Sequence, residues 1–531
     1  MRLFGLLVFL VAQAECFDAV ARNSQGHSPV FKYPSLRLGA RRLRLSEVDM
    51  SSAEVRNMRD YSPSVLETLR FVAPVSFIYV TNFLMGAIDS YSVSRFGGTM
   101  QLAALAPAVT GIEYVCYAFV WLSQAATKLL SDASGDVNEG RNVLSVAMFI
   151  AICAGFTQTL LSLIFAPAFM NLIGVAPEIA PFAIEYMRIR ACTAWAFYLT
   201  QVGASACFAK GDSLTPFAIS VSAGLVNLCG NFALCRREAW TATAGAAIAT
   251  VISQLLAMAC TFVLLAKGKL LPARPALPDL SAALRRFGST LRKLLPRFLS
   301  FAGPASVATT TRIFVYGFCN SMSCRIGTSA AAAAHQVGSN LWWGMSSLTA
   351  EPMEAATLSF LPARLQEDNA DDGSKRKVLT RRSARQIVRT QVNIEIVIGV
   401  MLSLLMGFTF GTESLGWFVD DPAVLALVPM KVVAVACTIV GPMLVLEGTL
   451  ICLGMYGWLV TNIVVSAIIS CVGMCVAERM MPTWRSPSLY WAFVDLFVIL
   501  RLIGNGFGVL KASREKPNLA ETRESKSYSP I

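Results

Sequence analysis

Ionisable side chains occur inside long apolar segments of this sequence, where a charge is expensive. Asp89 lies in LMGAIDSYSV, Arg312 in SFAGPASVATTTRIFVYGFC and Glu447 in LEGTLI. A charge near the middle of a bilayer costs about 2.5–3.5 kcal/mol on insertion scales. These residues are therefore candidates for a functional role. For Asp89 the alternative is a helix-end carboxylate that faces water close to Arg95.

Of these three residues, Arg312 is the least able to place its charge outside the apolar core of the membrane. It lies near the middle of the apolar segment 298–322, too far from either end to reach an interface easily. It must therefore face a cavity, a carboxylate or an anionic ligand. Glu351 and Glu447 are its expected partners in the same half of the chain and are candidate substrate-binding residues with it. A purely structural Arg–Glu pair is the alternative, because buried ion pairs need not be functional.

Amide and imidazole groups add to this set. Asn227 and Asn231 are four residues apart, so they share one helix face. They are candidates for a functional site, and hydrogen bonding between helices is the alternative. His335 and Gln336 lie near the start of an alanine-rich segment. We expect His335 to make a packing hydrogen bond, with a proton carrier as the alternative, and we take Gln336 as a candidate substrate ligand.

The sequence carries no signature of an enzyme or of an ATP-driven pump. It has two histidines, and its fourteen cysteines form no CxxC pair, which excludes a histidine-cluster oxygenase and a readable zinc or redox motif. There is no GxxxxGK(S/T) phosphate loop. No nucleophile-elbow motif accompanies His335. We therefore expect neither catalytic residues, nor a metal site, nor a bound cofactor.

Membrane-spanning helices must position these residues. Of the 531 residues 55% are hydrophobic and only 15% are charged, whereas soluble domains carry about 25% charged residues. Mean hydropathy is +0.56. A span needs about 20 apolar residues. The sequence predicts an all-α integral membrane protein with twelve spans, near 69–92, 102–127, 142–166, 181–207, 215–235, 243–266, 298–322, 330–359, 390–410, 423–449, 455–477 and 488–511.

Basic residues gather in the loops between the spans. The loops 267–297 and 361–389 are rich in Lys and Arg, whereas 411–422 carries acidic residues. By the positive-inside rule, both termini and the even-numbered loops lie on the cytosolic or stromal side. The same rule explains the net charge of +12, because no basic, aromatic-interleaved surface for nucleic acid remains once the loops are assigned.

The chain contains a repeat at an offset of 230 residues. This offset pairs Ala73-Pro74 with Gly303-Pro304, and Ala125-Ala126-Thr127 with Ala355-Ala356-Thr357. Each copy holds six spans, and an even number gives both copies the same orientation in the membrane. We therefore predict two parallel, pseudo-symmetric six-helix lobes. The predicted divisions are a lobe over 63–266, a basic inter-lobe loop over 267–297, a lobe over 298–511 and a polar tail over 512–531.

The N-terminus is typical of targeting sequences. Residues 1–16, MRLFGLLVFLVAQAEC, combine a basic residue, a short apolar core and an A-x-A site, as a signal peptide does. Residues 17–62 are rich in Arg and contain Asp18 as the only carboxylate before Glu47. This acid-poor leader is similar to a transit peptide, and the two parts together resemble the bipartite presequence of proteins bound for plastids of secondary origin. A signal peptide followed by a disordered tail is the alternative, with the chain in the plasma membrane or an endomembrane.

Several motifs resemble the multidrug and toxic compound extrusion (MATE) family. They are GAIDSYSVSRFGG with QLAALAPA, GAAIATVISQ, AAAAHQVGSNLWW with AEPMEAATLSFLP, and LEGTLI, and the resemblance covers about residues 65–510. It is nearest to a plant branch that includes plastid-envelope members exporting organic acids. It implies that Asp89 takes part in proton or sodium coupling, with Asn227 and Thr250 in the same pocket. Asn231 stands where many relatives have a second Asp, which puts sodium coordination in doubt.

The resemblance also bears on the solute. Arg312 stands near where drug-exporting relatives have a Glu, so the charge is reversed, and Glu447 stands about where prokaryotic relatives have an Asp. Because arginine offers a forked carboxylate-binding group, we expect a proton-coupled exporter of small organic anions or xenobiotics that works by alternating access. One chain with two lobes suffices as a functional monomer, with membrane lipid around it. The alternatives are a lipid-linked precursor flippase of a related superfamily and a non-transporting membrane scaffold.

Overall fold

The computed structural model describes residues 62–117, 119, 121–133, 136–172, 175, 177–267, 280–324, 326, 329–369, 375–379, 382–408 and 422–514. The predicted signal peptide and nearly all of the predicted leader lie outside these residues, as does the tail after Arg514.

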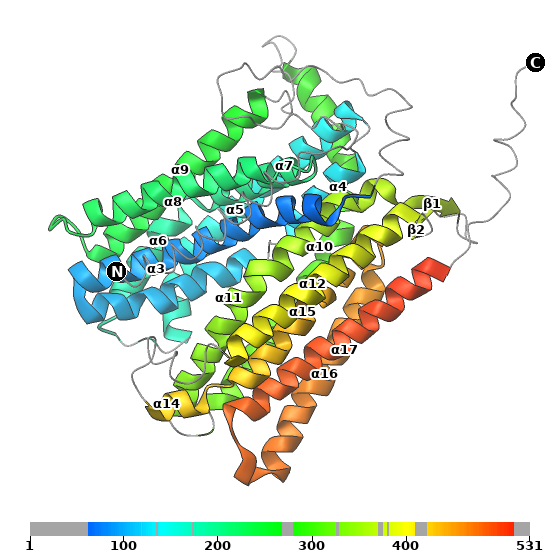
Figure 1. The fold of residues 1–531 in the computed structure, drawn as a ribbon. Helices are drawn as coiled ribbons and strands as arrows, with labels where there is room; N and C mark the ends of the chain where they lie inside the picture. Colours follow the sequence, from blue (N-terminus) through cyan, green and yellow to red (C-terminus); the bar gives the residue numbers. More distant parts are fainter. Residues whose placement is uncertain are drawn as a thin grey trace, which may run out of the picture. The chain divides into compact units, whose positions relative to one another are not determined.

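Helices account for nearly all of the described chain (Figure 1). The first lobe contains α3 (Val65–Tyr117), α4 (Trp121–Asp132), α5 (Val137–Leu172), α6 (Ala180–Ala191), α7 (Ala194–Phe208), α8 (Leu214–Leu234) and α9 (Ala242–Lys267). The second lobe contains α10 (Leu280–Cys324), α11 (Ser329–Phe360), α12 (Arg382–Phe408), α14 (Pro422–Leu427), α15 (Met430–Leu453), α16 (Tyr456–Met480) and α17 (Pro487–Arg514).

The predicted twelve spans correspond to these helices. The first span and the start of the second form α3, which bends at Gly98, where φ is 75° and a residue with a side chain would be strained. The fourth span is divided between α6 and α7. Within the described residues, eight helices are long and apolar enough to cross a membrane by length and composition. The spans that miss this criterion include α10 and α11, which carry Arg312, His335 and Glu351.

The two predicted basic loops contain regular structure that the sequence analysis missed. Helix α10 begins at Leu280 rather than near 298, because the basic segment 280–297 continues the helix beyond its apolar part. The second loop contains a 3₁₀ turn, η2 (Pro362–Arg364), and an antiparallel hairpin of β1 (Gln366–Asn369) and β2 (Lys375–Val378), in which Gln366 pairs with Val378. A further 3₁₀ turn, η3 (Pro482–Trp484), joins α16 to α17.

Close helix packing depends on small residues, as is usual between membrane helices. A Cβ on Gly245 of α9 would lie 2.8 Å from the backbone nitrogen of Cys235, at the end of α8. Between the lobes, α3 runs alongside α11 (Figure 1). There the rings of Phe71 and Phe360 are 5.0 Å apart, in a cluster that also includes Met353.

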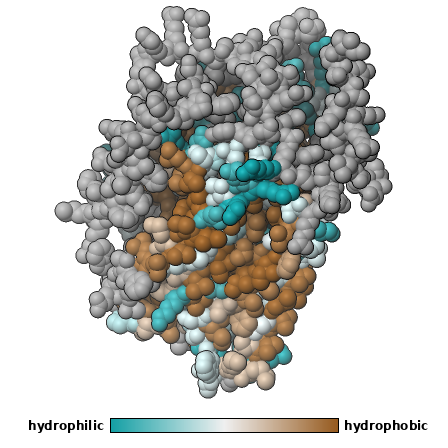
Figure 2. Space-filling model, turned by 45° about the vertical axis from the view of Figure 1, so that its right-hand side comes forward, coloured by the Kyte–Doolittle hydropathy of each residue, from teal (hydrophilic) through white to brown (hydrophobic). Residues whose placement is uncertain are grey.

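The outer face is apolar, as a lipid environment requires. Figure 2 shows a broad hydrophobic area on one face of the molecule. Large apolar side chains are exposed along three helices of the second lobe, α12, α16 and α17, including Val397, Met401, Ile468, Val472, Ile503 and Phe507. The chain is thus a multi-pass membrane protein.

Candidate functional site

The four residues predicted to form an ion-coupling group meet in the first lobe. Asp89 of α3 accepts hydrogen bonds from Asn231 of α8 (2.8 Å) and from Thr250 of α9 (3.2 Å). Asn227 lies 3.5 Å from the same carboxylate and donates to Thr250 Oγ1 at 3.1 Å. All four side chains are buried. The alternative interpretation of Asp89 as a water-facing residue beside Arg95 is wrong, because Arg95 is exposed and Asp89 is enclosed.

Two residues of α6 that the sequence analysis missed complete this group. The hydroxyl of Tyr186 donates to Asp89 Oδ2 at 3.0 Å, and Arg190 Nη1 donates to the Tyr186 oxygen at 3.2 Å. The guanidinium carbon of Arg190 lies 5.6 Å from the centre of the Tyr186 ring. The i,i+4 spacing of Tyr186 and Arg190 puts them on one helix face, and this spacing was a readable signal. We call the six residues the N-lobe cluster: Asp89, Tyr186, Arg190, Asn227, Asn231 and Thr250.

A second charged group lies in the other lobe and is built on three helices. The carboxylate of Glu447 on α15 forms an ion pair with Arg501 of α17. Its second oxygen lies 3.9 Å from Arg312 Nη1 on α10. The side chain of Arg312 is 24% exposed, compared with 2% for Arg501 and 4% for Glu447. Glu447 is therefore bound tightly by Arg501 and loosely by Arg312, and we call the three residues the C-lobe triad.

The triad confirms one predicted contact and adds a residue. Of the two expected partners of Arg312, Glu351 and Glu447, the structure pairs it with Glu447. Arg501 was missed, although it lies well inside the apolar segment 488–511 and meets the criterion that singled out Arg312. Glu351, the other expected partner, is half-buried on α11 and interacts electrostatically with Arg312.

Helix α11 brings further polar groups to the boundary between the lobes. Glu354 is buried, and its Oε1 accepts a hydrogen bond from Gln124 Nε2 of α4 at 3.2 Å. His335 Nδ1 accepts a hydrogen bond from Trp491 Nε1 at 3.2 Å, so this imidazole packs in the second lobe. Gln336 is part of α11, but its side chain lies outside the described residues.

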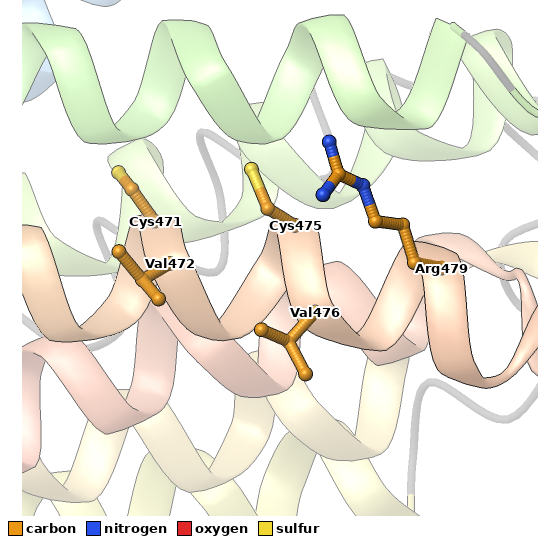
Figure 3. A pocket seen from close by; sticks show the side chains of 5 residues that line it. All are labelled: Cys471, Val472, Cys475, Val476 and Arg479. Carbon is orange, nitrogen blue, oxygen red and sulfur yellow. The ribbon is translucent and has the colours of Figure 1, made fainter.

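A small cavity of about 10 Å³, room for one water molecule, borders the triad. Gln124 lines it from the first lobe, and its other lining residues, among them Phe301, Pro304, Ala308, Arg312, Glu447 and Tyr456, belong to the second lobe. A larger hollow of about 300 Å³ lies on α16 (Figure 3). There Cys471, Cys475 and Arg479 point to the same side, and Val472 and Val476 complete the lining. Only Arg479 is charged in that hollow, so the triad is the better candidate for a solute site.

The two groups differ in chemistry. The N-lobe cluster directs hydroxyl and amide donors at one carboxylate, an arrangement suited to a single exchangeable proton or ion. The triad presents a partly exposed guanidinium, which suits a carboxylate or another anion. Among the described residues, no group of three or more His, Cys, Asp or Glu side chains could hold a metal ion.

Comparisons with known proteins agree with this architecture. The MatE family model matches residues 74–233. The chain is 28% identical over 359 residues to Protein DETOXIFICATION 47, chloroplastic, from Arabidopsis thaliana. That match covers 66% of this chain and 60% of the relative, so the chain spans less than two thirds of the relative's length.

Two solved transporters share the fold. A mutant of the MATE transporter VcmN from Vibrio cholerae superposes with a TM-score of 0.70 at 16% identity, covering 87% of this chain and 98% of that chain. A MOP superfamily transporter from Pyrococcus furiosus, whose binding pocket has a reverse polarity that suggests a different function, gives a TM-score of 0.66 at 16% identity, covering 91% of this chain and 100% of that chain. Both are transporters rather than enzymes, in agreement with the prediction. The chain is thus similar to MATE transporters in the sequence of its first lobe, over residues 74–233, and in its fold.

Proposed function

We propose that this protein is a secondary transporter that exports small organic anions by alternating access between its two lobes, with proton coupling at the N-lobe cluster. The observation that carries the proposal is that Glu447 pairs closely with Arg501 and only loosely with Arg312. Because Arg501 holds this carboxylate tightly, an incoming anion can replace it at Arg312 without leaving Glu447 unpaired.

The position of Arg312 supports this role. It borders the cavity that both lobes line, so a solute bound there touches the interface that alternating access opens and closes. The guanidinium can hold a carboxylate through two parallel hydrogen bonds. The Pyrococcus furiosus transporter, with its pocket of reverse polarity, is a precedent for a change of charge within this fold.

A second candidate solute is a cation. Glu351 and Glu354 add two carboxylates on α11 near the triad, and carboxylates attract cationic drugs. In this version Arg312 is a structural partner of Glu447, and the solute binds to α11. The two versions differ in what the loss of Arg312 does.

Proteoliposomes separate these candidates. The purified chain from residue 63 onward would be tested with labelled salicylate, labelled citrate and a cationic dye, each with and without an imposed pH gradient. We expect gradient-dependent anion flux that Arg312→Gln abolishes, whereas Arg292→Gln, an exposed arginine on the same helix, leaves it unchanged. Dye flux alone would support the cationic candidate. Absence of every flux would favour the flippase and scaffold interpretations.

The membrane is part of the proposal. Because the Arabidopsis thaliana relative is a chloroplastic protein, and because the N-terminal sequence is similar to a bipartite presequence, we place the transporter in a plastid envelope. A fluorescent fusion to residues 1–62 tests this location: it should enter plastids, and retention in the secretory pathway would contradict it.

A further inference from the structure

The chain Arg190–Tyr186–Asp89 gives the N-lobe cluster a cation of its own. Arg190 donates to the hydroxyl of Tyr186 at 3.2 Å, and this hydroxyl donates to Asp89 at 3.0 Å. The guanidinium is thus separated from the carboxylate by one hydroxyl group. We infer that Arg190 is the built-in counter-ion of Asp89 and excludes sodium and other alkali cations from the cluster. The inference deepens the proposed function, since it takes the cluster as the coupling site.

The hydrogen bonds around Asp89 leave no oxygen cage for a metal ion. Both carboxylate oxygens receive donors, from Asn231 and Asn227 on one side and from Tyr186 and Thr250 on the other. The amide oxygens are directed elsewhere: that of Asn227 accepts from Asn231 at 3.2 Å, and that of Asn231 accepts from the Cys235 thiol at 3.5 Å. An alkali cation requires several oxygen ligands at once, whereas a proton requires one carboxylate oxygen.

The charge balance leads to the same conclusion. Asp89 is the cluster's carboxylate, since position 231 holds an amide. Glu185, the next acid on α6, is engaged by Thr241 Oγ1 at 2.7 Å. Arg190 already compensates the charge of Asp89, so an added metal ion would be an unpaired charge in a buried site. Arg190 Nε is buried without a hydrogen-bond partner among the described residues, so this nitrogen makes no hydrogen bond that competes with the one from Nη1 to Tyr186.

A binding measurement tests this without transport. Thermal unfolding of the detergent-purified chain would be recorded at one pH in NaCl, KCl and choline chloride of equal ionic strength. A cation that binds only the folded state raises Tm. We expect wild type to give the same Tm in all three salts. The double substitution R190Q/N231D removes the built-in cation and adds a carboxylate, and should gain a sodium-specific rise of roughly a few degrees. Arg188→Gln, an exposed neighbour on the same helix, should behave as wild type.

Two results would overturn the inference. One is a sodium-specific rise in wild type that Asp89→Asn removes. The other is a folded R190Q/N231D variant with no response to sodium. If the double variant fails to fold, Arg190→Gln alone and direct binding of radioactive sodium to wild type decide the question. Because neither readout depends on flux, a failure of the anion-export proposal is distinguishable from a failure of this inference.

Discussion

Gln124 donates a hydrogen bond to Glu354 across the two lobes, and these residues are 230 positions apart in the chain. This separation equals the offset that superimposes the two copies in the sequence, so each residue occupies the place of the other in its own lobe. Two equivalent residues can touch only close to the axis that relates the lobes. The contact therefore lies close to the axis between the lobes, about which the proposed alternating access would turn them.

Removing this contact should destabilise the arrangement seen here. Gln124→Ala leaves the buried Glu354 carboxylate without that donor, at a cost of about 1–3 kcal/mol. We expect a lower Tm and a larger fraction of molecules with separated lobes, measured by cross-linking of cysteines introduced at 71 and 360, where α3 and α11 meet. Ser145→Ala is the control, because among the described residues the hydroxyl of Ser145 donates to Arg141 of its own helix. An unchanged Tm in Gln124→Ala would mean that the contact contributes little.

The C-lobe triad leads to a prediction with a rescue. Arg501→Met removes the tight partner of Glu447, and losing one member of a buried ion pair costs about 3–5 kcal/mol. Arg312 then has to neutralise Glu447 alone, so affinity for anions should fall about tenfold or more, a loss of at least about 1.4 kcal/mol. The double substitution R501M/E447Q should recover most of the stability. If the double variant unfolds at the same temperature as Arg501→Met, the unpaired charge of Glu447 is not the cause of the lost stability.

The sequence alone indicates the organisation of the molecule and much of the N-lobe cluster. The 230-residue repeat and the apolar lengths specify two lobes of six spans, because both depend on local composition. Asn227 and Asn231 are recognisable because their spacing fixes a shared face on one helix. Asp89 is recognisable because a carboxylate inside an apolar span is costly and therefore has few purely structural explanations.

What the sequence leaves open depends on how helices are turned toward each other. Both Glu351 and Glu447 could reach Arg312, and only the positions of α10, α15 and α17 in the fold show that Glu447 pairs with it. The i,i+4 spacing of Tyr186 and Arg190 indicates a shared helix face, but this short helix carries further charges, and spacing alone does not show that the face is buried. The segment 280–297 is helical although its basic composition is typical of a loop.

The coupling role of Asp89 has a clear signature. Asp89→Asn keeps the shape of the side chain but removes the exchangeable proton, so the protein should still exchange labelled for unlabelled solute across the membrane. It should not accumulate solute in response to a pH gradient. Counterflow and gradient-driven uptake in the same proteoliposomes measure both. Glu238→Gln, which removes an exposed carboxylate outside the cluster, is the control. Gradient-driven accumulation by Asp89→Asn would assign coupling to another group.

Close packing of α8 against α9 positions Asn231 and Thr250 on the two sides of Asp89, and a glycine permits it. Alanine at Gly245 would bring its Cβ within 2.8 Å of the backbone of Leu234 and Cys235, which cannot move aside as a flexible side chain could. Forced separation of packed elements costs about 1–3 kcal/mol. Gly317→Ala is the matched control, because nothing lies within 4 Å of a Cβ at that position of α10. We therefore expect Gly245→Ala to lower both Tm and gradient-driven uptake while Gly317→Ala changes neither. Equal effects of the two substitutions would show that helix propensity, rather than the close approach of α8 and α9, determines the result.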